Sequence, residues 1–133
     1  MNEKKSLTTE ETFSLAVQNH KNNNFQVAEN LYKKILKTNP NHFDAHNYLG
    51  VILLQSEDFQ KAKSCFEKAI EIDPNRVGAH NNLGLALKEL GELQKAKSCI
   101  EKAIEINPNY LGSYWNLHSF ASDIDEALTI LKK

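Results

Sequence analysis

A near-identical segment occurs twice in the chain, and its two copies are 34 residues apart. Gln60–Pro74 and Gln94–Pro108 carry the same residue at all but two positions. The same offset separates three prolines, namely Pro40, Pro74 and Pro108. A fixed period of this length is typical of stacked repeats. Because a catalytic centre needs a unique constellation of residues, a chain built by copying offers few places for one.

Each period contains two segments with apolar residues at i, i+3 and i+4 spacing, which predicts a pair of helices. The second segment of each full unit stops at Asn-Pro or Asp-Pro, because proline cannot continue a helix. Thr8 and Glu11 form a capping-box pattern, and Asn24 and Asp58 are predicted to cap later helices. Gly91 suits a left-handed helix terminus. The expected helices cover 9–21, 25–38, Phe43–Gln55, Phe59–Ile72, Val77–Leu90, Leu93–Ile106, Leu111–Ala121 and a last segment after Asp123.

The period divides the chain into a polar leader (1–8) and units at 9–42, 43–76, 77–110 and 111–133. The fourth unit is shortened, since its turn arrives three residues early and no proline closes it. Its last helix is short and apolar over much of its surface, whereas an end helix should be polar on its outer side. Two interpretations follow. This unit is either a compact cap or, as we favour, part of a fragment whose next element is missing.

Composition excludes several classes of protein. The formal net charge is −1, which argues against a nucleic-acid binder with a basic stripe. No run of 18 apolar residues is present, so the sequence predicts no membrane span. The first residues are polar and contain no hydrophobic core of a signal peptide. We therefore expect a cytoplasmic protein.

The two cysteines, Cys65 and Cys99, occupy equivalent positions in consecutive units. Equivalent positions of stacked helices lie about 8–10 Å or more apart, whereas a disulfide needs Cα atoms within about 7 Å. Their spacing also lacks the close CxxC pairing of a zinc or redox site. We expect two reduced, partly buried thiols.

The paired helices and the 34-residue period resemble the tetratricopeptide repeat (TPR) family. In that pattern a Leu-Gly pair marks the first helix, small residues mark the helix crossings, and a proline closes the unit. The matching residues here are Leu49-Gly50, Leu83-Gly84, Ala28, Ala62, Ala96, Tyr32, Phe66, Ala69, Ala103, Pro40, Pro74 and Pro108. The middle units are similar to bacterial arrays and to the TPR region of O-GlcNAc transferase. The resemblance implies an all-α, right-handed superhelical solenoid of about eight helices.

This resemblance also implies a concave groove, lined by the first helix of each pair, that binds peptides or protein segments. One family device is a clamp of Lys, Asn and Arg that holds a C-terminal carboxylate. Only Asn82 matches it here, because its basic positions are occupied by Asn47, Gly112 and Asn116. The carboxylate clamp is therefore absent.

A second family device is a ladder of asparagines that hydrogen-bonds a peptide backbone, as in O-GlcNAc transferase. Asn82 and Asn116 match it, whereas Ser14 and Tyr48 interrupt it. An amide side chain can donate and accept at once, as a peptide unit requires. The alternatives are that these asparagines are only solvated and that the nearby aromatic residues pack within the array. The predicted peptide-binding residues are Asn47, Tyr48, Asn81, Asn82, Trp115 and Asn116.

No other motif in the sequence indicates a metal site or a catalytic site. His42 and His46 have the i, i+4 spacing of helical metal ligands, but no third ligand is evident, so we predict no metal and no cofactor. No nucleophile is placed beside a base, so we predict no enzymatic activity for this chain alone. The prediction is a protein-interaction scaffold. The alternatives are a substrate-recruiting region of a larger transferase and a module that forms homo-oligomers through its last helix.

Overall fold

The computed structural model describes residues 6–119, and every regular element within that range is an α-helix. The six complete helices are α1 (Thr9–Lys21), α2 (Phe25–Thr38), α3 (Phe43–Gln55), α4 (Phe59–Ile72), α5 (Val77–Glu89) and α6 (Leu93–Ile106). Residues 111–119 are also helical. The predicted all-α fold is confirmed. The helix expected after Asp123 lies outside the described residues.

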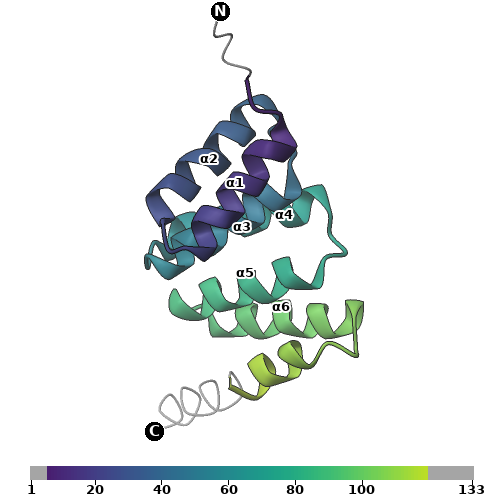
Figure 1. Ribbon diagram of the computed structural model, residues 1–133. Helices are drawn as coiled ribbons and strands as arrows, with labels where there is room; N and C mark the ends of the chain where they lie inside the picture. Colours follow the sequence, from purple (N-terminus) through teal and green to yellow (C-terminus); the bar gives the residue numbers. More distant parts are fainter. Residues whose placement is uncertain (1–5, 120–133) are drawn as a thin grey trace, which may run out of the picture.

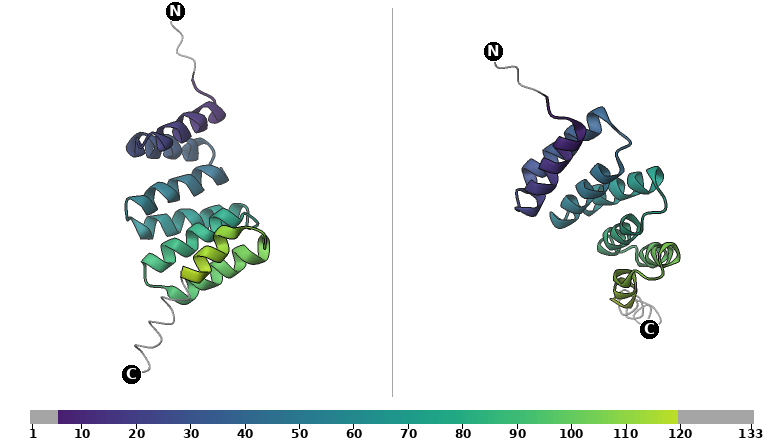
Figure 2. Two further views of the ribbon diagram at one scale, coloured as in Figure 1. Left: turned by 60° about the horizontal axis from the view of Figure 1, so that its bottom comes forward. Right: turned by 45° about the vertical axis from the view of Figure 1, so that its right-hand side comes forward.

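Consecutive helices form antiparallel pairs that stack into a right-handed solenoid (Figure 1). Each pair packs closely within itself, and the second helix of one pair packs on the first helix of the next, as α2 does on α3 and α4 on α5. The views in Figure 2 show the helices following one another from the N-terminal to the C-terminal end of the array. The apolar core therefore runs along the stack rather than around one centre.

The helix ends largely follow the sequence signals. Thr8 and Glu11 form the predicted capping box of α1, and the carboxylate of Asp58 accepts a hydrogen bond from the backbone N–H of Lys61. Gly91 has a φ of +81°, as expected for a left-handed terminus. Asn24 does not act as predicted, because its side-chain amide donates to Asn19 instead of capping α2.

In each of the first three units, the turn between the two helices has a residue in the left-handed backbone conformation at the same position. Only one of these three residues is glycine. Asn23 and Glu57 have φ values of 63° and 64° at the positions equivalent to Gly91. Asparagine tolerates this region well, but glutamate rarely occupies it. The repeat therefore imposes its turn geometry even where the local residue does not favour it.

Small residues bring the two helices of a pair into contact. A Cβ atom on Gly50 would lie 2.5 Å from the Phe66 ring, and one on Gly84 would lie 2.7 Å from the Cδ1 atom of Ile100. Real Cβ atoms do not approach other atoms so closely, so glycine sets the separation of α3 from α4 and of α5 from α6. Alanines with no exposed surface occupy the other crossing points, namely Ala28, Ala62, Ala69, Ala96 and Ala103.

In the first unit the large residue at the position of Phe66 is Tyr32, and it is polar. Its side chain is fully buried, and its hydroxyl has no hydrogen-bond partner among the described residues. Burial, with a smaller contribution from Tyr48, raises the pKa of Tyr32 to about 12. A buried hydroxyl without a partner loses its hydration and gains nothing in return.

Substitution of the crossing glycines tests the packing of the pairs. Although alanine favours a helix by about 0.5–1 kcal/mol, Gly50→Ala should lower the free energy of unfolding by a net ~1–2 kcal/mol because the Phe66 ring cannot yield. Gly84→Ala should cost less, since the clashing atom is the tip of a flexible side chain. Urea unfolding followed by circular dichroism measures both. Gly78→Ala, where a Cβ meets nothing within 4 Å, is the control and should stabilise; equal effects at all three sites would contradict this account.

Removal of the Tyr32 hydroxyl should stabilise the protein. Tyr32→Phe keeps the packed ring and deletes the unpartnered group, so we expect a gain of about 1 kcal/mol in the free energy of unfolding. The matched control is Tyr48→Phe, on a ring that is 37% exposed, which should change stability by less than about 0.5 kcal/mol. A destabilised Tyr32→Phe variant would show that the hydroxyl makes a favourable interaction.

Candidate functional site

The first helices of the units lie on the inner side of the curved stack. α3 and α5 contact each other directly, whereas α4 and α6 approach each other less closely. A hydrogen bond joins the two first helices, from the Nδ2 atom of Asn82 to the Oδ1 atom of Asn47 at 3.2 Å. Two of the predicted binding residues therefore meet across the junction between units, although they lie 35 positions apart.

A hollow of about 460 Å³ lies between α5 and the helical residues 111–119. It contains four of the six predicted binding residues, from two consecutive units. None of the residues that line it is an aspartate, glutamate, lysine, arginine or histidine. They are Gly78, Asn81, Asn82, Leu85, Tyr110, Leu111, Gly112, Trp115 and Asn116.

Asn81 is the most buried member of this set, at 5% exposed. Its Nδ2 atom donates to the hydroxyl oxygen of Ser113 at 3.0 Å, and its Oδ1 atom has no partner among the described residues. A serine hydroxyl can donate or accept, so the amide could be turned over without losing this bond. Either orientation leaves one buried polar atom of Asn81 unpaired.

The other hollow residues differ in exposure. Asn82 and Asn116 are half-buried, whereas Trp115 is 74% exposed. Large apolar side chains are normally covered in a folded protein, and an exposed tryptophan beside a hollow is typical of a contact surface. The hollow therefore combines an apolar wall with amides that can hydrogen-bond.

Tyr48 lies apart from this hollow, in an aromatic cluster between the first two units. Its ring centroid is 5.7 Å from that of Phe13 and 6.1 Å from that of Tyr32. The Phe13 ring also lies 5.3 Å from the imidazole of His42. Packing within the array, the alternative considered for Tyr48, accounts for much of its surface, although 37% remains exposed.

Two histidines that sequence reasoning weighed only as metal ligands have local structural partners. The Nδ1 atom of His42 accepts from the backbone N–H of Ala45 and caps α3. The Nε2 atom of His46 lies 2.8 Å from the carbonyl oxygen of Pro40, and His80 makes the same contact with Pro74. A carbonyl can only accept, so Nε2 carries the proton in both rings. Within residues 6–119, no group of three potential ligands could hold a metal ion.

Arg76, for which no sequence motif predicted a role, lies at the junction of the second and third units. Its guanidinium lies 4.4 Å from the centroid of the Phe43 ring, 3.3 Å from the carboxylate of Asp44 and 3.8 Å from that of Asp73. Because this guanidinium already stacks on a ring and pairs with carboxylates, it would bind a ligand carboxylate more weakly than a free arginine would.

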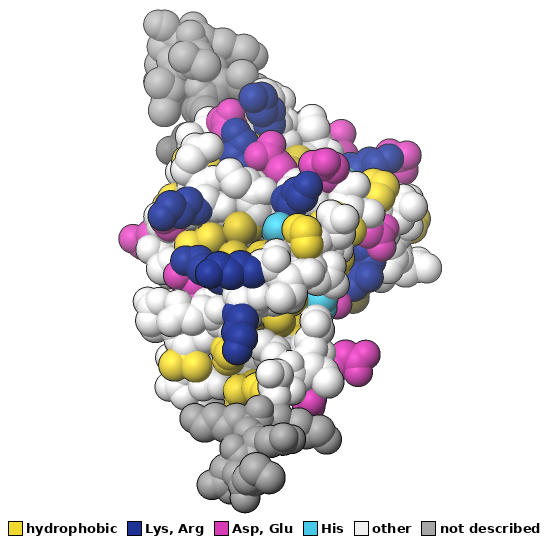
Figure 3. All heavy atoms as spheres, turned by 90° about the horizontal axis from the view of Figure 1, so that it is seen from above, with side chains coloured by type: hydrophobic (Ala, Val, Ile, Leu, Met, Phe, Trp, Pro, Cys, Tyr) yellow, Lys and Arg dark blue, Asp and Glu magenta, His cyan; other side chains and the backbone are white. Residues whose placement is uncertain are grey.

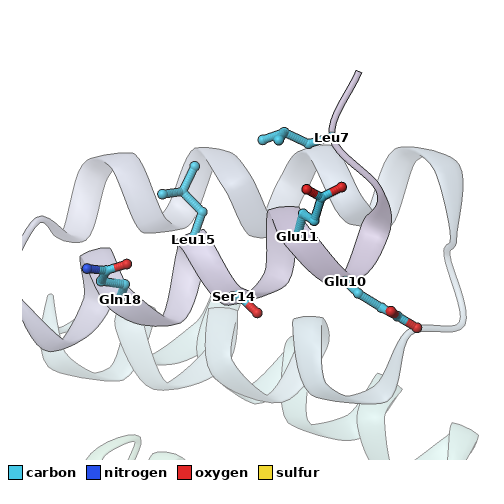
Figure 4. A pocket seen from close by; sticks show the side chains of 6 residues that line it. All are labelled: Leu7, Glu10, Glu11, Ser14, Leu15 and Gln18. Carbon is cyan, nitrogen blue, oxygen red and sulfur yellow. The ribbon is translucent and has the colours of Figure 1, made fainter. Parts of the chain in front are cut away.

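A second hollow, of about 430 Å³, lies on α1 (Figure 4). Leu7 and Leu15 are half-exposed there, and Glu11 is occupied in the capping box. Leu15 is equivalent to Leu49, which is buried in the hydrophobic core cluster. This hollow differs from the one on α5 because two carboxylates, those of Glu10 and Glu11, line it together with a single amide, that of Gln18.

Acidic, basic and apolar side chains are interspersed on the face in Figure 3. Most of the ion pairs join residues three or four positions apart on exposed helix surfaces, where each contributes little. Among the described helices, none has the length and hydropathy needed to span a membrane.

Comparison with known families identifies this architecture. The family described as "Tetratricopeptide repeat" matches residues 43–76 and 77–110, which together make up just over half of the chain. The protein thus belongs to the tetratricopeptide-repeat family. No curated protein sequence matches the chain.

Several solved structures share the fold. The first TPR domain of Spaghetti (RPAP3), bound to the HSP90 peptide SRMEEVD, is 18% identical, with a TM-score of 0.84 over 88% of this chain and 93% of that one. The Sgt2 TPR domain from Aspergillus fumigatus is 24% identical, with a TM-score of 0.85 over 91% and 82%. An O-GlcNAc transferase from Thermobaculum terrenum is 21% identical, with a TM-score of 0.82 over 90% of this chain but 23% of the enzyme. At these identities the likeness concerns the fold.

The two cysteines are free and partly buried. Burial raises the pKa of the Cys65 thiol to about 11, and it also raises the pKa of Cys99. The thiolate is the reactive form of cysteine, so a raised pKa makes both residues poor nucleophiles at neutral pH. Their partly buried positions fit a role in helix packing.

The raised pKa of these thiols should make their alkylation slow. Because the shift from 9.0 to about 11 lowers the thiolate fraction about 100-fold, Cys65 should react with iodoacetamide at pH 7.5 at least 100-fold more slowly in the native protein than in denaturant. Below the pKa, the native rate should rise about tenfold for each unit of pH. Mass spectrometry of the alkylated peptides follows each cysteine separately. Equal rates in native and unfolded protein would refute the assignment.

Proposed function

We propose that this protein is a non-catalytic interaction module that binds an extended peptide or protein segment along its first helices. The family supports an interaction role, because TPR domains of the same fold include one bound to a peptide. The observation that carries the proposal is the row of amides on consecutive first helices. It runs from the bonded pair Asn47 and Asn82 to Asn81 and Asn116 at the hollow.

Amides suit an extended peptide because each backbone unit presents one donor and one acceptor. An asparagine side chain can satisfy both at once, and it does so without selecting particular ligand side chains. Asn82 uses its Nδ2 atom in the bond to Asn47, which leaves the Oδ1 atom of Asn82 able to accept from a ligand N–H. Exposed aromatic surface on Tyr48 and Trp115 would add apolar contact area at either end of the row.

The segment that this groove recognises differs in charge from the acidic peptide in the Spaghetti complex. The hollow on α5 is lined by uncharged residues, and Arg76 already pairs with two carboxylates. A ligand carboxylate would therefore lose its hydration without gaining a charged partner. We infer that recognition depends on the peptide backbone and uncharged side chains.

A second candidate function is the recruitment of substrates for a larger transferase. The likeness to the O-GlcNAc transferase, of which this fold covers 23%, favours it. In that case the groove would still bind a protein segment, and the chemistry would belong to another domain. Purification of the natural gene product and measurement of its mass distinguishes a separate module from part of an enzyme.

Removal of the amides should weaken binding while leaving the fold intact. Peptides selected from a random phage-displayed library on the full chain serve as ligands, and isothermal titration calorimetry measures their Kd. Asn82→Ala combined with Asn116→Ala should raise Kd about 5- to 150-fold, since two lost hydrogen bonds are worth about 1–3 kcal/mol.

The matched control combines Asn30→Ala with Gln60→Ala, two exposed amides on the second helices α2 and α4. This variant should bind with the Kd of the original protein. If no library peptide bound, or if the Asn82 and Asn116 double variant bound as well as its control, the proposed groove would be wrong.

A further inference from the structure

We infer that the hollow between α5 and residues 111–119 is a subsite for one aromatic side chain of the bound segment, and that this side chain carries a hydrogen-bonding group, as tyrosine and tryptophan do. The inference rests on the proposed peptide-binding function and adds to it the class of residue that is recognised. Four features of the hollow support it, namely its neutrality, its exposed tryptophan, its glycines and its unpaired amide.

Neutrality excludes a charged side chain as the occupant. Charged residues make up 25% of the chain, yet none of the nine residues that line the hollow is charged. An ionised group that entered would be partly dehydrated without a counter-charge, which is costly. Lysine, arginine, aspartate and glutamate side chains are therefore disfavoured.

Exposed apolar surface at the hollow favours a ring. Trp115 is 74% exposed and Leu111 is 80% exposed, and Tyr110 beside them is 47% exposed. Offset stacking or edge-to-face contact between two aromatic rings adds about 0.5–1.5 kcal/mol beyond the burial of surface. An aliphatic side chain would gain the burial alone.

Glycine makes room for the ring. Gly78 is the second residue of α5, and a Cβ atom there would meet nothing within 4 Å. Glycine inside a helix costs about 0.5–1 kcal/mol relative to alanine, and no packing contact explains its presence here. The equivalent residues of the first two units are Glu10 and Asp44, whose side chains would extend into this space. The glycine opens the hollow at the cost of helix stability.

The unpaired amide atom of Asn81 is the reason to expect a ring that carries a hydrogen-bonding group. Asn81 lines the hollow, is 95% buried and keeps one amide atom without a partner in either orientation of the group. Such an atom is rare in a folded protein unless a ligand or water satisfies it. A tyrosine hydroxyl can donate or accept, so it pairs with Asn81 whichever way the amide is turned. A phenylalanine ring would leave the atom unpaired.

The chain contains its own reporter for this subsite. Trp115 is its single tryptophan, so the indole N–H gives one cross-peak in a ¹H–¹⁵N spectrum. The probes are the amides of N-acetyltyrosine, N-acetylphenylalanine and N-acetylglutamate, which share neutral ends. The tyrosine probe should shift this cross-peak saturably, with a Kd of about millimolar. The phenylalanine probe should bind about fivefold more weakly for want of one hydrogen bond, and the glutamate probe should cause no saturable shift.

Substitutions then distinguish loss of ligand binding at the subsite from loss of the folded structure. Gly78→Ala should raise the melting temperature and yet weaken tyrosine-probe binding at least fivefold, an opposition that a purely structural role does not produce. Trp115→Ala should weaken binding of the library-selected peptides, whereas the neighbouring Tyr114→Ala, which lies outside the lining, should not. Equal shifts with all three probes, or unaltered binding by Gly78→Ala, would overturn the inference.

The two proposals fail differently. If the Asn82 and Asn116 double variant lost peptide binding while Gly78→Ala and Trp115→Ala bound normally, the groove would stand and the aromatic subsite would be wrong. If the tyrosine probe bound as described but no extended peptide did, the subsite would stand and the groove would be wrong.

Discussion

The close approach of the two helices in each pair determines the geometry of the whole array. Gly50 lies against the Phe66 ring and Gly84 against Ile100, with too little space for a Cβ atom at either glycine. Because interiors pack at near-crystalline density, this contact sets both the distance and the crossing of the helices. Repetition of the contact every 34 residues makes successive pairs nearly equivalent, and the stack becomes a regular solenoid.

A regular stack assigns different tasks to the two helices of a unit. The second helices α4 and α6 have almost the same sequence. Each packs on the first helix of its own unit, and α4 also packs on α5, the first helix of the next. The first helices differ more. They bring Asn47 to Asn82 across one junction, and Asn81 to Ser113 across the next. Variation on a fixed frame is how repeat proteins obtain binding surfaces.

Among the described residues, two buried polar groups have no hydrogen-bond partner, and at these places the repeat array is not optimised for stability. Tyr32 buries a hydroxyl inside the first unit, and Asn81 buries an amide at the hollow. The two differ in setting. The Tyr32 hydroxyl lies within the core cluster and does not line the hollow. Asn81 lies at the hollow with the exposed Trp115 and with Gly78, which no packing contact requires. Ligand binding therefore explains better why the protein keeps an unpaired buried amide at a cost in stability.

The helices, their pairing and the class of fold could be predicted from the sequence, because local periodicity, proline stops and small crossing residues act within one unit and recur in the next. The sequence also pointed to the first helices as the variable surface. Which of their side chains meet depends on how the units are arranged in three dimensions. The Asn82–Asn47 bond, the cluster around Tyr48, the partner of Asn81 and the hollow beside Gly78 all join residues of different units. Such contacts depend on the rotation between units, which arises from packing summed over whole helices and is not encoded in any one segment.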